Sequence, residues 1–216
     1  MSRYRGRKTK IGTAVYNHII NNKREYLIIT ILFFIGLVIA IIFLNNASED
    51  FLTEINTYLS DLFNNIKNYE NINFTKIFKK SIIYNITITI LLWFGASTII
   101  GIPIVYGSII LKGFSIGYTI SCLLTVFGVW KGLLLSLTLL LLHNIIFIPT
   151  MFAISVSGIK LYNSIMKNKQ RENIKIEILR HTIFCLIMCI PMTVSTLLET
   201  YVSSNIGIIL LEYLKI

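Results

Sequence analysis

The sequence predicts an all-α protein, a polytopic integral membrane bundle of about five transmembrane helices with an amphipathic helix in its first outer loop. Three observations predict this fold class. Hydrophobic residues make up 55% of the 216 positions, and the mean hydropathy is +0.73, far from the balance of a soluble domain. These residues are gathered in blocks long enough to cross a hydrocarbon core of roughly 30 Å. Most of the charged residues lie in the segments between the blocks.

The first span is expected at residues 26–44, which contain no charge. The apolar core of a cleaved signal peptide is shorter and ends at small residues, whereas this block is long and ends in Phe43-Leu44-Asn45-Asn46. We therefore interpret it as an uncleaved span. It divides the chain into a basic arm, residues 1–25, and a single membrane domain, residues 26–216. A short interfacial helix is expected over residues 11–26 of this first region.

The loop after the first span, residues 45–80, has helical periodicity. Its apolar residues recur at spacings of three and four: Phe51, Leu52, Ile55, Leu59, Leu62, Phe63 and Ile66. Ser48 is a suitable N-cap, and Glu49 and Asp50 suit the amino terminus of a helix. The pattern predicts an amphipathic helix of about four turns. It is either a platform for an extracytoplasmic partner or a helix that lies on the bilayer or on its own bundle.

Further apolar blocks predict spans at residues 82–100, 104–129, 132–157 and 182–198. Residues 82–111 form one apolar run that as a single helix would measure about 45 Å, so it must tilt, bend or break. The expected break is Gly101-Ile102-Pro103, because proline has no amide hydrogen and crowds the preceding turn. Residues 206–211 are too short to cross alone, and the placement of the segment after Tyr201 stays open.

The distribution of positive charge predicts the orientation of the chain. Seven of the 20 Lys and Arg precede the first span, and six more lie in the loop at residues 158–181. The loop at residues 45–80 balances its lysines against acidic residues. Loops rich in Lys and Arg stay in the cytoplasm, so the amino terminus and residues 158–181 are expected inside and residues 45–80 outside. The net charge of +10 is therefore mainly a topology signal, and membrane lipid rather than nucleic acid is the expected partner.

Lys112 is the one charged residue between Ser81 and Trp130. A charge inside the membrane costs roughly 2.5 to 3.5 kcal/mol unless a partner or water compensates it. If the chain reverses at Gly101–Pro103, Lys112 lies about 17 Å inward, near mid-membrane. If residues 101–111 instead form a short interfacial or re-entrant piece, Lys112 marks the cytoplasmic start of the third span. The second arrangement is favoured, because residues 113–129 are just long enough to cross.

The spans contain few residues that could carry chemistry. No Asp or Glu occurs in them before Glu199. His143 and Asn144, followed by Pro149, form a polar notch in the fourth span, and such residues usually face the bundle interior. With no acidic partner in a span, His143 is interpreted as a packing residue rather than a proton relay. No catalytic residue, metal ligand or cofactor site is predicted, and the chain is expected not to be an enzyme.

Small residues mark the expected helix contacts. Gly113 and Gly117 form a G-x-x-x-G pair, and Ser97 and Gly101 have the same spacing. Such pairs let helix backbones approach closely, within one chain or between copies, so a homo-oligomer stays an open alternative. The three cysteines lie in apolar segments and are interpreted as packing residues rather than metal ligands or disulfide partners.

Several of these elements together resemble the stage II sporulation protein M family. They are Gly101-Ile102-Pro103, Leu111-Lys112-Gly113-Phe114, Gly117-Tyr118-Thr119 and Asn144-Ile145-Ile146-Phe147-Ile148-Pro149, with the basic amino terminus, first span and outer loop. The resemblance extends over nearly the whole chain. Sporulation members usually have Pro-Gln-Asn, and the wider family often has Pro-His-Gly, where this chain has Leu142-His143-Asn144. The proline that would bend the helix at that point is therefore missing.

The resemblance implies a function and a set of partners. Family members of this kind are scaffolds in the mother-cell membrane during endospore engulfment. They recruit the peptidoglycan hydrolases known as stage II sporulation proteins D and P to the septum, and the scaffold itself has no catalytic chemistry. The residues expected to form the packing or assembly core are Gly101, Pro103, Lys112, Gly113, Phe114, Gly117, His143, Asn144 and Pro149. The alternative is a small membrane transporter or permease subunit in which Lys112 and His143 line a polar path.

Overall fold

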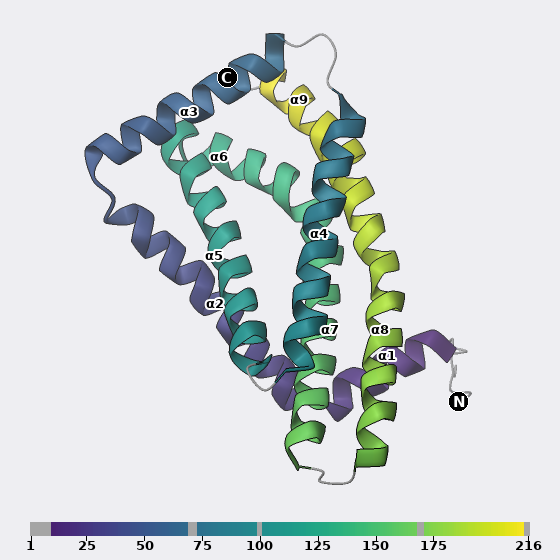
Figure 1. Ribbon diagram of the computed structural model, residues 1–216. Helices are drawn as coiled ribbons and strands as arrows, with labels where there is room; N and C mark the ends of the chain where they lie inside the picture. The colour runs from purple at the N-terminus through teal and green to yellow at the C-terminus, as the bar shows by residue number, and fades with distance from the viewer. Residues whose placement is uncertain (1–9, 69–72, 99–100, 168–170, 214–216) are drawn as a thin grey trace, which may run out of the picture.

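The structure is a computed structural model that describes residues 10–68, 73–98, 101–167 and 171–213. Within these ranges the chain is almost entirely helical, and five helical segments are long and apolar enough to cross a membrane (Figure 1). They are Lys23–Asn45, Phe74–Ala96, Gly101–Phe127, Val129–Met166 and Ile174–Gly207. The predicted fold class, a polytopic helical bundle, is confirmed.

The first span is α2, Lys23–Asn45, and the shorter α1, Lys10–Asn21, precedes it. The helix expected over residues 11–26 is thus divided at Asn22, whose side-chain amide donates to the carbonyl of His18 at 2.5 Å. The His18 ring stacks on Phe184 of α8, Arg171–Leu197, with 5.3 Å between the ring centroids. α1 therefore packs across the end of the bundle where α7 and α8 are joined (Figure 1). Residues 1–9 of the basic arm lie outside the described ranges.

The amphipathic helix is α3, Glu49–Asn68. The amide of Phe51 donates to Oγ of Ser48 at 3.4 Å, so Ser48 occupies the predicted capping position. The Phe51 ring lies 6.1 Å from Phe43 of α2, and Phe63 lies 5.1 Å from Phe127. The apolar side of α3 therefore rests on its own bundle. The acidic residues Glu49, Asp50, Glu54 and Asp61 remain exposed, and the side chain of Ile66 lies outside the described part of the chain.

α4, Phe74–Ala96, begins well before the predicted span, at a cap that the sequence analysis did not identify. Oδ1 of Asn73 accepts a hydrogen bond from the amide of Lys76 at 3.0 Å. α5 follows at Gly101–Phe127. The reversal thus falls between Ala96 and Gly101 rather than within Gly101–Pro103, and residues 99–100 lie outside the described ranges.

α5 is one continuous helix, so the favoured arrangement for Lys112 is wrong. Residues 101–111 are not a separate interfacial piece, and Lys112 lies about 17 Å along the helix from Gly101. The arrangement that placed Lys112 near the middle of the span describes the structure. The reason is that Pro103 falls in the first turn of α5, where its missing amide hydrogen interrupts no helical hydrogen bond.

Each of the last two membrane segments contains a π-helical segment. The fourth consists of α6, Val129–Ser136, η1, Leu137–Leu141, and α7, Leu142–Lys167. The fifth consists of α8, η2, Leu198–Ser203, and α9, Ser204–Tyr213. The candidate span Ile174–Gly207 extends past residue 198, where the predicted span ends, and it includes Glu199. The segment after Tyr201 continues the fifth span as a helix.

The spans form two groups that diverge toward one end of the molecule (Figure 1). α2 and α5 lie side by side, while α4, α7 and α8 pack on one another. α1 and the α7–α8 junction lie at one end, and α3 and α9 contact each other at the opposite end. The basic and acidic extramembrane segments are therefore at opposite ends, which is the separation that the predicted orientation requires.

Candidate functional site

The contact between α2 and α5 is built on glycine. A Cβ added to Gly113 of α5 would overlap the carbonyl oxygen of Phe33 in α2, and one added to Gly36 of α2 would overlap the carbonyl oxygen of Ile110. At Gly117 an added Cβ would lie 2.7 Å from the nearest backbone oxygen of α2. The two backbones therefore touch along the contact. The G-x-x-x-G pair is used within this chain, where it leaves no space for any side chain.

Phe114 lies beside this glycine contact. Its ring stacks on Tyr118, with 6.1 Å between centroids and 13° between planes, and meets Phe43 of α2 edge-on at 6.0 Å. Such aromatic pairs contribute about 0.5 to 1.5 kcal/mol beyond the area they bury. Phe114 therefore supports the same pair of helices as Gly113.

Gly101 and Pro103 shape the start of α5. A Cβ at Gly101 would overlap the carbonyl oxygen of Gly95 in α4, so glycine is needed where the end of α4 meets the start of α5. Pro103 is exposed in the first turn of α5. Both residues act on the connection between α4 and α5, away from the charged groups described next.

Lys112 extends from α5 toward α4 and α7. Its Nζ lies 4.2 Å from the centroid of the Phe147 ring and 5.7 Å from that of Tyr84. A cation within about 6 Å of an aromatic face is stabilised by about 0.5 to 2 kcal/mol. The carboxylate of Glu199 lies within electrostatic range as well. The charge of Lys112 is therefore compensated by two aromatic rings and one acid.

The predicted fifth span ends at residue 198 and does not include Glu199. In the structure this acid acts on Lys112. Its carboxylate accepts a hydrogen bond from the hydroxyl of Ser81 in α4. Its charge acts on Lys112 of α5 and on His143 of α7. One side chain in η2 is thus linked to three other helices. We call Lys112, His143 and Glu199 the charged cluster.

His143 and Asn144 are both buried at the start of α7. The carbonyl of His143 accepts a hydrogen bond from the hydroxyl of Ser195 in α8 at 2.9 Å. The side-chain amide of Asn144 donates to the carbonyl of Leu140 in η1 at 2.8 Å. Nδ1 of His143 and Oδ1 of Asn144, by contrast, have no hydrogen-bond partner within the described ranges. Buried polar atoms without a partner are rare, so both atoms need an explanation.

Further hydrogen bonds join α4 to α8. The amide of Asn85 donates to Thr196 at 2.8 Å, and Nε1 of Trp93 donates to Thr182 at 2.9 Å. Hydrogen bonds between membrane helices contribute about 0.6 kcal/mol on average and up to about 1.7 kcal/mol. The group formed by α4, α7 and α8 is therefore held by polar contacts in addition to apolar ones.

Both π-helical segments adjoin these polar residues. η1 ends two residues before His143, η2 contains Glu199, and the two segments contact each other. A π-turn carries one more residue than an α-turn and changes the direction in which the following side chains point, and such turns occur frequently at functional sites. The departures from α-helical geometry thus coincide with the buried polar side chains.

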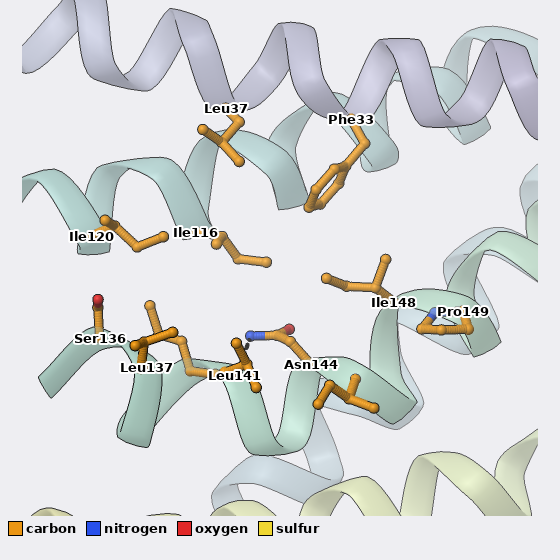
Figure 2. A pocket seen from close by; sticks show the side chains of 12 residues that line it. Phe33, Leu37, Ile116, Ile120, Ser136, Leu137, Leu141, Asn144, Ile148 and Pro149 are labelled. Carbon is orange, nitrogen blue, oxygen red and sulfur yellow. Dashed lines mark hydrogen bonds between the residues drawn. The ribbon is translucent and has the colours of Figure 1, made fainter. Parts of the chain in front are cut away.

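A cavity of about 440 Å³ lies between α2, α5 and the η1–α7 segment, and we call it the lateral cavity (Figure 2). Phe33, Leu37, Ile116 and Ile120 line one side, as Figure 2 shows. The other side is lined by Ser136, Leu137, Leu140, Leu141, Asn144, Ile145, Ile148 and Pro149. The volume is in the range of ligand pockets, roughly 300 to 1,000 Å³. Asn144 and Pro149 of the predicted notch therefore face this cavity.

A polar cavity of about 340 Å³ lies where α1 meets α7 and α8, at the basic end of the bundle. It is lined in part by His18, Lys160, Arg180 and His181. Burial, and then the charge of Lys160, lower the pKa of His18 from its ordinary value of 6.5. Arg180 is paired with Glu177 at 2.9 Å. This end of the molecule therefore has positive charge next to the interfacial helix α1.

The predicted residues thus divide among separate places. Lys112 and His143 share the charged cluster, Asn144 and Pro149 face the lateral cavity, and Gly113 and Gly117 form the α2–α5 contact. Among the described residues, no group of three or more His, Cys, Asp and Glu side chains could hold a metal ion. The residue that the sequence analysis missed is Glu199. The apolar pattern that resumes at Ile206 could have revealed it, because it indicates that the helix continues past the acid.

The family comparison covers most of this structure. The family model described as Stage II sporulation protein M matches residues 29–204, which include the five membrane segments almost entirely, α3 and the charged cluster. Searches of curated proteins and of solved structures gave no match. Because the family model matches well over half of the chain, the protein belongs to the stage II sporulation protein M family and is a sporulation-related, multi-pass membrane protein.

Proposed function

We propose that this protein is a non-enzymatic scaffold for endospore engulfment, which recruits the peptidoglycan hydrolases known as stage II sporulation proteins D and P to the septal membrane of the mother cell. The observation that carries the proposal is the family match over residues 29–204. It includes the whole of α3 and nearly all of the membrane bundle, so the resemblance is one of architecture rather than of a single motif.

The exposed side of α3 is the proposed docking surface outside the membrane. Phe63 of its apolar side is buried against the bundle, and Glu49, Asp50, Glu54 and Asp61 are exposed on the rest of the helix. Tyr58 is 65% exposed between these acids. A helix that is held rigidly on a bundle and carries acids around an aromatic ring suits a partner with a basic surface.

The proposed orientation places α1 and the α7–α8 junction in the cytoplasm and α3 outside the mother-cell membrane. Its support is the excess of Lys and Arg at the first end and the balanced charge of residues 45–80. In this orientation α3 lies on the side where hydrolases act on the cell wall.

Recovery of the tagged protein from sporulating cells tests the scaffold role. The two hydrolases should accompany the wild-type protein after mild crosslinking. They should be recovered less well with a variant in which Glu54 and Asp61 are replaced by Lys. The matched control is Glu177→Lys, which changes an acid at the opposite end of the bundle. A deletion strain that completes engulfment at a normal rate would contradict the proposal.

The charged cluster supports a second candidate, a small transporter or permease subunit. Ionisable residues inside a membrane often mark a substrate path, and here Lys112, His143 and Glu199 lie together. In this case Lys112→Met should abolish flux into vesicles while the protein still folds and still recovers its partners. The scaffold role predicts instead that the same substitution lowers the protein level or partner recovery.

A further inference from the structure

The lateral cavity contains a buried hydrogen-bond acceptor that nothing in the described chain satisfies. Asn144 is 6% exposed, and its Oδ1 has no hydrogen-bond partner. Its amide nitrogen is already used by the Leu140 carbonyl, which fixes the oxygen as the free atom of the side chain. Figure 2 shows the Asn144 side chain between the α2–α5 wall and the α7 wall, facing the space that separates them.

Pro149 removes one backbone hydrogen-bond donor from α7, next to the same cavity. Proline has no amide hydrogen, so it cannot donate to the carbonyl of Ile145, four residues earlier in α7. Ile145 and Pro149 both line the lateral cavity. Among the described side chains that line the cavity, Oδ1 of Asn144 is the buried acceptor without a partner.

On the α7 side the cavity borders residues that are exposed on the outside of the bundle. Leu141 and Ile145 line it, and their side chains are 44% and 59% exposed although they belong to a membrane-spanning segment. An occupant can therefore enter sideways from the bilayer, without passing through the bundle.

The polarity of the cavity excludes two simple occupants. A stable buried water needs about two to four polar partners, whereas the side chains lining this cavity are polar only at Asn144 and Ser136, and the Ser136 hydroxyl already donates to Leu133. A lipid acyl chain fits the apolar walls, but it has no hydrogen-bond donor for Oδ1 of Asn144. A protein helix that carries a Ser, Thr, Tyr or amide side chain among apolar residues has both properties.

We infer that the lateral cavity is the docking site for one transmembrane helix of a partner protein, which inserts apolar side chains and donates a hydrogen bond to Oδ1 of Asn144. The inference rests on the proposed scaffold role and gives it a second contact surface, inside the membrane. A partner would then contact α3 outside the membrane and the lateral cavity inside it. Separate variants test each of these two surfaces.

Photocrosslinking in native membranes tests the inference. A benzophenone side chain is placed at Leu141, on the rim of the cavity, and in a control protein at Val194 of α8, which is 42% exposed but does not line the cavity. The expected result is a protein adduct from position 141 only. Its crosslinked peptide should be an apolar segment of membrane-spanning length that contains a hydrogen-bond donor.

Two variants test whether the crosslinked adduct depends on the lateral cavity. Asn144→Leu removes the acceptor, and Ile145→Trp fills the rim while leaving Asn144 in place. The matched control is Ile187→Trp, an exposed isoleucine of α8. Loss of one interhelical hydrogen bond should weaken docking about three- to eighteen-fold, so the adduct should fall accordingly in Asn144→Leu. Ile145→Trp should lower the adduct by blocking the rim, and the control should keep it.

Other outcomes overturn the inference. They are adducts with lipid only, adducts between two copies of this chain, equal adducts from positions 141 and 194, and an undiminished adduct in Asn144→Leu that is properly folded.

Recovery of the hydrolases in the same variants separates this inference from the proposed function. If the hydrolases are recovered equally well with Asn144→Leu and position 141 gives no protein adduct, the scaffold role stands and the cavity inference fails. If a donor-bearing helix is crosslinked but no hydrolase is recovered, the cavity inference stands and the named partners are wrong.

Discussion

The contact between α2 and α5 differs in kind from the contacts among α4, α7 and α8. The first is made by glycines that bring two backbones together, and it includes Gly36, Gly113 and Gly117. The second includes a glutamate, a histidine and several hydroxyl and amide groups, and Lys112 of α5 extends into it. Apolar burial cannot distinguish one membrane helix from another, because lipid is as apolar as leucine. Each group therefore uses another source of specificity: steric fit in one and polar pairing in the other.

The difference also decides where adaptability lies in the molecule. The glycine contact leaves no space for an added side chain, so a larger residue there would separate the two helices. The polar group includes π-turns and polar atoms without partners, and it forms one wall of the lateral cavity. A contact with unused hydrogen-bonding capacity can accept another molecule. We therefore expect variants in the first group to affect folding and variants in the second to affect folding less and partner binding more.

The strongest test of this comparison is Gly113→Leu. The new side chain would overlap the backbone of α2, so the two helices would have to separate. We expect a loss of about 3 kcal/mol in the free energy of unfolding, at the upper end of overpacking effects. Thermal unfolding in detergent measures it. Gly107→Leu on the same helix is the control, since no atom lies within 4 Å of an added Cβ there. Equal losses in the two variants would mean that the α2–α5 contact is not built on glycine.

A smaller loss is expected from Glu199→Gln in the polar group. The substitution keeps the shape of the side chain and an oxygen that can accept from Ser81, but it removes the negative charge that acts on Lys112 and His143 and that strengthens the Ser81 hydrogen bond. We expect a loss of about 2 kcal/mol, the scale of one hydrogen bond to a charged group. Glu177→Gln, which breaks an exposed ion pair, should cost less than about 1 kcal/mol. If both variants have the same stability as wild type, the cluster does not stabilise the fold.

The hydrogen bond between Asn85 and Thr196 measures a single polar pair. We expect Asn85→Leu and Thr196→Val each to destabilise the protein, with a coupling of about 0.6 to 1.7 kcal/mol between them in a double-mutant cycle. The same cycle between Asn85 and Thr138, an exposed hydroxyl of η1, should give no coupling. Additive effects at Asn85 and Thr196 would show that polar pairing contributes little to this group.

The smallest effect is expected at the edge of the polar group, in the pH dependence of α1 docking. Because burial and the charge of Lys160 lower the pKa of His18, the undocked helix binds the proton more strongly than the docked one. Docking is therefore favoured above pH 6.5 and weakens as the pH falls below it. Energy transfer between labels on α1 and α8 measures the change. His18→Phe should keep the contact with Phe184 and remove the pH dependence, and a response that survives this substitution would assign the effect to another group.

The sequence predicted the features that depend on neighbouring residues. The apolar blocks were long enough to identify five spans, and the periodicity from Phe51 onward identified α3 together with its cap at Ser48. The G-x-x-x-G spacing indicated a close helix contact, although it could not show that α2 is the helix that packs there. Patterns of this kind succeed because hydrophobic periodicity and capping are local properties.

The features that the sequence did not predict depend on residues far apart in the chain. Glu199 meets Ser81 across 118 positions, and no local pattern pairs them. The predicted fifth span ends at residue 198, nine residues before Gly207, and therefore leaves Glu199 out. The sequence favours Lys112 at a helix start because residues 113–129 alone are long enough to cross, whereas α5 begins at Gly101. Proline in the first turn of a helix is in fact favourable, so Gly101 and Pro103 begin α5.

The π-turn before His143 gives the fourth span a fixed angular phase. Each residue added to or removed from a helix rotates everything on one side of it by about 100° relative to the other. The π-turn absorbs one residue more than an α-turn does, so the helix on either side of Leu137–Leu141 keeps its face. If the same five residues were α-helical, either Gly132 would lose its place against α5 or His143 and Asn144 would turn away from theirs. The π-helical geometry of this short segment is therefore what lets both parts of the fourth span keep their contacts.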